Sequence, residues 1–357
     1  MKTTFWLPAV LCIILFLVLL IWLIVRNIRK PVPYNLSLSQ HPGDTIFVSV
    51  ASYRDELCPS TLQNLFERAA APQHIYVGLC LQNAKGDAAC PADGLCINGT
   101  CYADHVRTHS MKHTQAKGPA YARYHCAQLY RGERFFLQID SHMEFVQDWD
   151  AKILRQWRAA PVPAGSAGAV LTHYPPADMT DEVRQGKVTT HICNGKFEPD
   201  GMVSFLSTQH GTKPLPMRTY FLAGGFLFGP GTLVAAVPYD PHLLYLFWGE
   251  EVLLAARLWT SGYDIFSPSE AVCSHVYERF DKPNVFTDTT SGGRERTMHK
   301  EQDRVHRRVK QLLGWEPQDG KHREMDKYGM GSRRPLAQFL AESKIDVQKK
   351  TVGSHCG

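Results

Sequence analysis

The stretch Phe135–His142, a nearly apolar run that ends abruptly in Asp140 and His142, constrains the fold more than any other part of the sequence. Short apolar runs with polar ends are typical of strands buried on both faces of a sheet. Side chains at positions i and i+2 of a strand point to the same face, so Asp140 and His142 are expected to lie together. A carboxylate and an imidazole at the rim of a sheet can hold a cation, although a hydrogen-bonded turn is the more common use of such a pair.

Segments with strand-like and helix-like periodicity alternate on both sides of this run. Expected strands span residues 45–52, 74–81, 134–142, 168–174 and 221–228, and expected helices span 59–69, 118–129, 148–158 and 252–260. The alternation predicts an α/β fold with a doubly wound sheet, which binds ligands outside the carboxyl ends of its strands. Residues 175–216 are expected to be mostly loop. The sequence contains neither a P-loop nor a Gly-x-Gly-x-x-Gly motif, so the usual nucleotide cradles are absent.

Two further polar segments follow expected strands. Residues 52–55, Ser-Tyr-Arg-Asp, come directly after the first strand and are expected at the same sheet edge as Asp140. His275 ends the segment that begins at Tyr263. A histidine in this position is either a structural residue or a third metal ligand.

Paired glycines and paired glutamates mark a second candidate region. Gly224 and Gly225 interrupt an apolar stretch, which indicates a bulge or the close approach of a ligand to the backbone. Glu250 and Glu251 begin a helix. The helix dipole favours a carboxylate there and accounts for one of them. The second is a candidate for contact with a substrate.

The segment Phe5–Val25 is one uninterrupted hydrophobic run, long enough to cross a bilayer at about 20 residues per span. It is too long for a cleaved signal peptide, and no small-residue cleavage site follows it. The sequence therefore predicts an N-terminal transmembrane anchor over residues 1–30 and a short proline-containing stem over 31–44. The charges that flank the anchor weakly favour a cytosolic C-terminal domain.

Cysteines and glycosylation sequons favour the opposite orientation. Cys90, Cys96 and Cys101 crowd one loop, beside the sequon that begins at Asn98, and another sequon begins at Asn35. Clustered cysteines in such a loop indicate disulfides in an oxidising compartment. A zinc knuckle is the alternative, but the cysteine spacing fits it poorly. We therefore expect a lumenal domain.

Five motifs, taken in order, resemble the catalytic core of the polypeptide N-acetylgalactosaminyltransferases. They are Lys117-Gly118 with Arg123, Asp140-Ser-His142, Ala223-Gly-Gly225, Trp248-Gly-Glu-Glu251 and Cys273-Ser-His275. Residues 52–55 and the segment from Tyr328 to Arg334 are instead similar to the sister family of polypeptide α-N-acetylglucosaminyltransferases. The resemblance covers residues 45–346.

The resemblance implies a GT-A-type, Rossmann-like mixed sheet that binds a UDP-sugar. It implies that Asp140, His142 and His275 bind a divalent metal, typically Mn²⁺, which bridges to the diphosphate. The implied donor-binding residues are Ser52, Arg54, Asp55, Lys117, Arg123, Ala223, Gly224, Gly225 and Trp248. Arg279 is a further candidate, because arginine pairs well with phosphate oxygens.

The catalytic candidates are Glu251, Glu250 and Asp140. Related enzymes have glycine at the position of Glu250, so the sequence leaves open which glutamate faces the sugar.

The predicted function is metal-dependent transfer of N-acetylglucosamine (GlcNAc) from UDP-GlcNAc to a serine, threonine or hydroxyproline hydroxyl of a protein. The resemblance implies retention at the anomeric carbon. Residues 45–291 are expected to form the catalytic domain, and the basic extension 292–357 to pack on it. We interpret the basic extension as a solvated helix or a lid over the diphosphate, not as a nucleic-acid site.

The expected location is a Golgi or other secretory-pathway membrane. The alternatives are a metal-dependent hydrolase that uses the same Asp/His/His set, and an inactive membrane-tethered carbohydrate-binding module.

Overall fold

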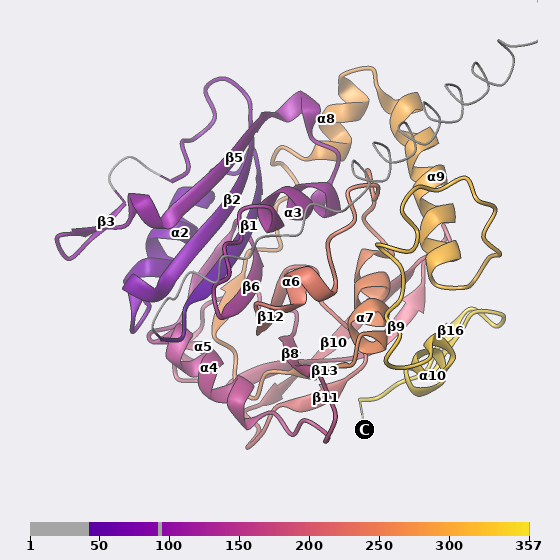
Figure 1. Ribbon diagram of the computed structural model, residues 1–357. Coiled ribbons are helices and arrows are strands. Elements are labelled where there is room, and N and C mark those ends of the chain that lie inside the picture. Colours follow the sequence, from indigo (N-terminus) through magenta and orange to yellow (C-terminus); the bar gives the residue numbers. More distant parts are fainter. Residues whose placement is uncertain (1–42, 92–94, 357) are drawn as a thin grey trace, which may run out of the picture. The chain divides into compact units, whose positions relative to one another are not determined.

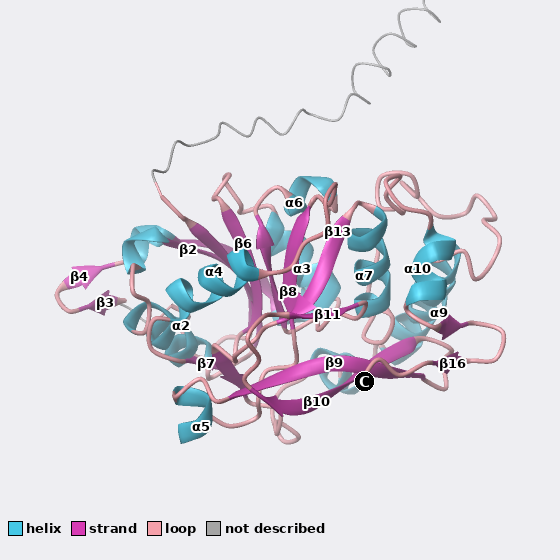
Figure 2. Ribbon diagram, turned by 90° about the horizontal axis from the view of Figure 1, so that it is seen from below, coloured by secondary structure: helices cyan, strands magenta, loops and turns pink. Residues whose placement is uncertain are grey.

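An eight-stranded mixed sheet forms the centre of the computed structural model, which describes residues 43–91 and 95–356 (Figures 1 and 2). In spatial order the strands are β11 (Met217–Thr219), β13 (Tyr263–Ser267), β8 (Gly168–Thr172), β12 (Phe226–Pro230), β6 (Phe135–Asp140), β1 (Ile46–Tyr53), β2 (Ile75–Asn83) and β5 (Val106–Lys112). Strands β6, β1, β2 and β5 are parallel, whereas β12 runs antiparallel between β6 and β8. The predicted α/β mixed sheet is confirmed.

The register of the parallel strands brings their carboxyl ends together. Ala51 of β1 pairs with Asp140 of β6, and Ser52 pairs with Leu81 of β2. The turn that follows β1 and the polar end of β6 therefore lie at one edge of the sheet, where open α/β sheets bind ligands.

Helices cover both faces of the sheet. They are α2 (Cys58–Glu67), α3 (Pro119–Ala127), α4 (Trp149–Ala159), α5 (Asp181–Arg184), α6 (Leu233–Ala236), α7 (Glu250–Thr260), α8 (Val285–Ser291), α9 (Glu295–Leu312) and α10 (Leu336–Glu342), with 3-10 turns at Pro72–His74, Ala103–His105 and His113–Gln115. Apolar residues of α2 and α4 join Val48 and Val50 of β1 in the main core. On the other face, Ala122 and Cys126 of α3 pack against Cys80 of β2. This is the doubly wound arrangement.

Two sequence expectations for the middle of the chain were wrong. Residues 175–216 contain a long hairpin, β9 (Val188–Phe197) with β10 (Val203–Gly211), which was expected to be loop. Its buried positions are partly polar: Thr189 donates a hydrogen bond to the carbonyl of Pro268 at 2.7 Å, so no apolar alternation marks the strand. The expected strand 221–228 also begins later, at Phe226, because the backbone before it turns away from the sheet.

The disulfides that the clustered cysteines predicted are confirmed. Cys58 pairs with Cys90, Cys96 with Cys101 across the small ribbon β3 (Cys96–Ile97) and β4 (Thr100–Cys101), and Cys193 with Cys356. The zinc-knuckle alternative is therefore wrong. Cys80, Cys126 and Cys273 are free thiols.

The C-terminal segment is joined to the rest of the domain by ion pairs whose carboxylates are buried. The Arg308 guanidinium of α9 lies 2.7 Å from Asp240, and Arg334 lies 2.8 Å from Asp264 of β13. The chain ends near β15 (Ile345–Asp346) and β16 (Thr351–Val352).

The expected anchor, residues 1–30, and all but Gly43 and Asp44 of the expected stem lie outside the described residues. Within the part of the chain that the structure describes, no helix is long and apolar enough to cross a membrane.

Candidate active site

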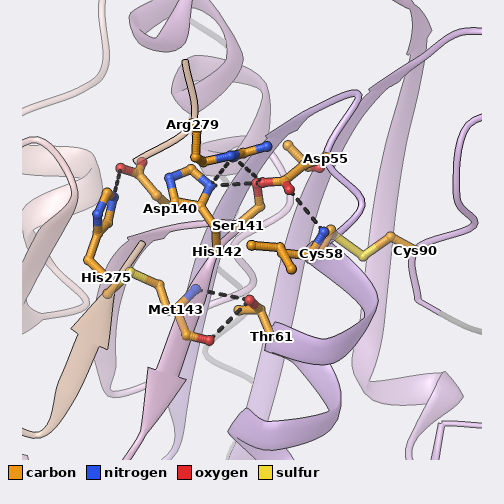
Figure 3. Close-up of polar contacts among 12 residues, drawn as sticks. Asp55, Cys58, Thr61, Cys90, Asp140, Ser141, His142, Met143, His275 and Arg279 are labelled. Atoms are coloured by element: carbon orange, nitrogen blue, oxygen red, sulfur yellow. Dashed lines mark hydrogen bonds and ion pairs between the residues drawn. A yellow bond between two sulfur atoms is a disulfide. The ribbon is translucent and has the colours of Figure 1, made fainter. Parts of the chain in front are cut away.

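Asp140, His142 and His275 lie together, and one potential ligand atom from each lies within 4.8 Å of the others (Figure 3). Asp140 ends β6, and His142 follows two residues later, as the strand period predicted. His275 arrives from a distant part of the sequence on a two-stranded ribbon, β7 (Met143–Phe145) with β14 (Cys273–His275). In this ribbon His275 pairs with Met143, which places it beside His142.

The three side chains are mutually oriented. Nε2 of His275 lies 3.1 Å from Oδ2 of Asp140, and the His142 and His275 rings stand edge to face with centroids 4.6 Å apart. Burial alone would raise the pKa of Asp140, but the hydrogen bond with His275 and the nearby Arg123 guanidinium outweigh burial and hold that pKa far below its usual range. Asp140 is therefore ionised and available to bind a cation.

The donor set fits a hard or borderline divalent cation. One carboxylate and two imidazoles suit Mn²⁺, and three protein ligands leave positions for ligands from a substrate. The site is also shaped at its rim by Gly225: a Cβ at this residue would lie 2.8 Å from Oδ2 of Asp140. The residues present thus fit a divalent metal, which would be held by Asp140, His142 and His275.

Arg123 links this cluster to helix α7. Its Nη2 donates to Asp140 at 3.0 Å and its Nη1 donates to Glu250 at 2.7 Å. The guanidinium is almost fully buried, with 6% of its side chain exposed. Glu250 is therefore engaged by Arg123.

Glu251 occupies the neighbouring position and faces a different set of groups. Its Oε1 accepts a hydrogen bond from the Gly224 amide at 2.7 Å, and its Oε2 accepts one from the Tyr174 hydroxyl at 2.6 Å. Burial raises the pKa of Glu251 to about 7, although both hydrogen bonds oppose the rise. Tyr174 was not a sequence candidate; its position just after the strand β8, at the ligand-binding edge, was the available signal.

The segment 223–225, called the glycine segment below, lies between Glu251 and the cluster of Asp140, His142 and His275. Ala223 donates its amide hydrogen to Thr172 at 2.9 Å, and the carbonyl of Gly224 accepts a hydrogen bond from Gln138 at 2.6 Å. The segment is thereby fixed between Glu251 and the Asp140 cluster.

The turn after β1 shows a mixed outcome. Ser52 is fully buried and its hydroxyl has no hydrogen-bond partner among the described residues. Arg54 adopts a left-handed backbone conformation with φ of 48°, and its guanidinium pairs with Asp87 at 3.0 Å and Asp288 at 2.8 Å. Asp55 points inward, against His142 and Arg279. Of these three expected nucleotide contacts, only Ser52 has its polar group unengaged.

The remaining candidates are Lys117, Trp248 and Arg279. The Lys117 ammonium lies 5.6 Å from the centre of the Tyr121 ring. Trp248 is 40% exposed, stacks edge to face with Phe247, and directly precedes the first turn of α7. Arg279 lies four residues after His275, next to the metal-ligand candidates.

Comparison with known proteins identifies a matching sequence family and solved structures with a similar fold. Residues 45–103 and 96–349 match the sequence profile of the family described as Glycosyltransferase (GlcNAc). No curated protein sequence matches the chain.

Among solved structures, GalNAc-T7 with UDP, GalNAc and Mn²⁺ superposes with a TM-score of 0.54 at 13% identity, over 86% of this chain and 58% of that one. The chain thus spans less than two thirds of the length of this relative.

Two further structures are more distant. Residues 1–349 of S. aureus TarS, in complex with UDP-GlcNAc, have a TM-score of 0.40 at 13% identity, over 80% of this chain and 78% of that fragment. The mannosyltransferase PcManGT of Pyrobaculum calidifontis, with GDP-Man and Mn²⁺, has a TM-score of 0.43 at 14% identity, over 92% and 86% of the two chains.

Proposed function

The chain belongs to the GlcNAc glycosyltransferase family, and we propose that it transfers GlcNAc from UDP-GlcNAc to a hydroxyl group of a protein, with the help of a divalent metal. The observation that carries the proposal is the convergence of Asp140, His142 and His275 within 4.8 Å at the ligand-binding edge of the sheet. A divalent ion held there stabilises the negative charge that the leaving diphosphate gains as the glycosidic bond breaks.

Buried oxygens without partners support a nucleoside site beside the metal ligands. Ser52 Oγ and Gln82 Oε1 lie at the carboxyl ends of β1 and β2, and both are buried without a hydrogen-bond partner among the residues described. Buried acceptors of this kind are costly unless a donor reaches them. The imide hydrogen of uracil and the ribose hydroxyls are donors of the required kind.

The sugar is proposed to bind between the glycine segment and helix α7. Glu251 and Tyr174 present polar atoms there, and the backbone of Gly224 and Gly225 permits close approach. Both Glu251 oxygens accept hydrogen bonds and Glu250 is paired with Arg123, so both carboxylates already have partners within the protein. We propose that the transfer retains the anomeric configuration, as the resemblance implies, and that the acceptor attacks from the front face.

The acceptor is proposed to be a serine, threonine or hydroxyproline hydroxyl of a polypeptide. Exposed aromatic side chains directly before α7 support a polypeptide partner: Phe247 is 55% exposed and Trp248 is 40% exposed. Aromatic residues are enriched at sites that bind polypeptides.

We further propose that the enzyme is anchored in a Golgi or other secretory-pathway membrane, with its catalytic domain in the lumen. Three disulfides support an oxidising compartment. Asn98 of the second sequon is exposed at the tip of the β3–β4 ribbon. Endoglycosidase treatment of the chain expressed in a eukaryotic host tests the orientation: lumenal exposure yields a glycan-dependent mass shift that Asn98→Gln reduces, whereas a cytosolic domain yields none.

The activity test uses the full-length chain in detergent with Mn²⁺, a panel of radiolabelled UDP-sugars, and peptides that contain serine, threonine or hydroxyproline. We expect label transfer to peptide from UDP-GlcNAc, and loss of transfer in Asp140→Ala. Donor hydrolysis without transfer supports a metal hydrolase instead, and UDP-sugar binding without any turnover supports a carbohydrate-binding module. Transfer at the wild-type rate by Asp140→Ala contradicts the metal assignment.

A further inference from the structure

The carboxylate of Asp55 is the most heavily hydrogen-bonded acidic group near the metal-ligand candidates (Figure 3). Its Oδ2 accepts from Ser141 Oγ at 2.5 Å, and lies 2.8 Å from His142 Nδ1 and 2.7 Å from Arg279 Nη1. Its Oδ1 accepts from the amide of Leu57 at 3.0 Å. The side chain is only 1% exposed, so a nucleotide has no access to it.

The contact between Asp55 and His142 fixes which ring nitrogen carries the proton. A nitrogen lone pair facing a carboxylate oxygen at 2.8 Å would be repelled, so Nδ1 of His142 carries the hydrogen and donates it to Asp55. Arg279 Nη1 lies against the same nitrogen, and a guanidinium can only donate. We therefore assign both nitrogens as donors that share the Asp55 Oδ2 acceptor, rather than Nδ1 as an acceptor from Arg279. The lone pair of His142 is then on Nε2, which faces Asp140 in Figure 3.

Two links hold Asp55 and His142 in register. Helix α2 begins three residues after Asp55, at Cys58, and the Cys58–Cys90 disulfide anchors this end of the helix. One turn along, Thr61 donates to the carbonyl of Met143 at 3.1 Å and accepts from its amide at 3.0 Å. Met143 directly follows His142 and begins strand β7. The two hydrogen bonds with Thr61 therefore join the start of helix α2, just after Asp55, to the backbone just after His142.

We propose that Asp55 is a positioning residue: it orients His142 so that Nε2 faces the metal, and it anchors Arg279 beside the same site. This inference deepens the proposed function and rests on it. It replaces the sequence-based expectation that Asp55 contacts the nucleotide. Carboxylates that accept the second hydrogen of a ligating histidine fix its tautomer and orientation, and their loss typically weakens metal binding about 10- to 100-fold.

The test measures Mn²⁺ binding to the full-length chain in detergent, by electron paramagnetic resonance at saturating UDP. We expect Asp55→Ala to raise the Kd for Mn²⁺ about 100-fold, and Asp55→Asn about 10-fold, because the amide oxygen still accepts from His142 but carries no charge. Pulsed measurements of the bound Mn²⁺ should show weaker or more heterogeneous ¹⁴N coupling in Asp55→Asn, since the His142 ring is no longer held in one orientation.

Asp150→Asn is the matched control. Asp150 is also a buried acid, but it accepts hydrogen bonds from the backbone amides of Ala70 and Ala71. Its replacement is expected to lower the melting temperature while leaving the Kd for Mn²⁺ unchanged. If Asp55→Ala does not fold, Asp55→Asn carries the test.

Three outcomes are distinguishable. A raised Kd for Mn²⁺ and an altered ¹⁴N coupling in the Asp55 variants, with neither change in Asp150→Asn, support the inference. Wild-type Mn²⁺ binding by Asp55→Asn overturns it and leaves the proposed function intact. Failure of the unmodified chain to bind Mn²⁺ with UDP overturns both.

Discussion

The carboxylate of Glu250 accepts a hydrogen bond from Arg123 Nη1 at 2.7 Å, in surroundings where both side chains are less than 10% exposed. The same guanidinium donates to Asp140 through Nη2 at 3.0 Å. Arg123 therefore places a positive charge beside a proposed metal ligand, and Glu250 balances that charge. Pairing with Arg123 gives the Glu250 carboxylate a structural role.

Removal of Glu250 should leave the buried Arg123 guanidinium without one of its two carboxylate partners, so that Asp140 alone faces it. We expect Glu250→Ala to lower the free energy of unfolding by about 3–5 kcal/mol, the typical cost of breaking a buried ion pair from one side. Urea unfolding monitored by circular dichroism measures the change. The double variant Arg123→Met/Glu250→Leu should cost less than the sum of the two single changes, because neither Arg123 nor Glu250 is then left without the other, and Asp140 keeps its contact with His275.

An exposed ion pair supplies the comparison for this experiment. Arg304 and Glu301 on α9 lie 3.6 Å apart with 56% and 29% of their side chains exposed. Glu301→Ala should change the free energy of unfolding by less than about 1 kcal/mol. A Glu250→Ala effect of that same small size would show that Arg123 finds another partner or solvent.

Gly225 tests how closely the backbone approaches the proposed metal ligands. An added Cβ would lie 2.8 Å from Oδ2 of Asp140, a distance that requires the carboxylate to move. We expect Gly225→Ala to reduce transferase activity at least tenfold and to weaken Mn²⁺ binding. Gly211→Ala is the matched control, because its nearest neighbour would be the Lys187 carbonyl at 3.9 Å. Equal activities in the two variants would mean that Asp140 has room to move without loss of function.

The sequence predicted most reliably the features that depend on the residues of a single strand. The apolar runs of β1 and β6 were readable as buried strands, and the spacing of Asp140 and His142 on β6 and its extension predicted that they converge. Edge strand β5 was missed, because only Val106 and Met111 of its seven residues are apolar. Long-range pairing was also beyond reach: the ribbon that brings His275 to Met143 depends on contacts between residues 128 to 132 positions apart.

The same limit explains Asp55 and the paired glutamates. Local sequence places Asp55 at a strand end, and Glu250 and Glu251 in one helix turn. Which way each side chain points is decided by partners from other elements, namely His142, Arg123 and Tyr174. Burial and partner identity, and not the residue type, separate the positioning groups from those that face a substrate.

The raised pKa of Glu251 predicts a pH-dependent contribution to stability. Burial raises the pKa of this carboxyl from 4.5 to about 7 in the folded chain. Between these values the folded state binds a proton that the unfolded state has released, so the free energy of unfolding should fall as pH rises and level off above about pH 7. At about 1.4 kcal/mol per pKa unit, the contribution lost is about 3 kcal/mol.

Urea unfolding at pH 5 and pH 8 measures the contribution of Glu251 to the free energy of unfolding, with Glu251→Gln as the reference variant. The difference between the chain and this variant isolates Glu251 from buried histidines such as His173 and His191, whose pKa values are lowered by burial and which act in the opposite sense. An identical pH dependence in both proteins would place the pKa of Glu251 near its ordinary value.

Metal and nucleotide should bind cooperatively at the Asp140 cluster. Asp140, His142 and His275 would hold the ion and leave further positions open, where negatively charged diphosphate oxygens would bind more strongly than water. We expect the Kd for Mn²⁺, measured by titration calorimetry, to fall at least tenfold when UDP is saturating, and linkage requires Mn²⁺ to tighten UDP binding by the same factor. His275→Ala removes one ligand and should abolish the coupling while leaving weak, metal-independent UDP binding. Equal Mn²⁺ affinities with and without UDP would mean that the cation does not bridge to the diphosphate.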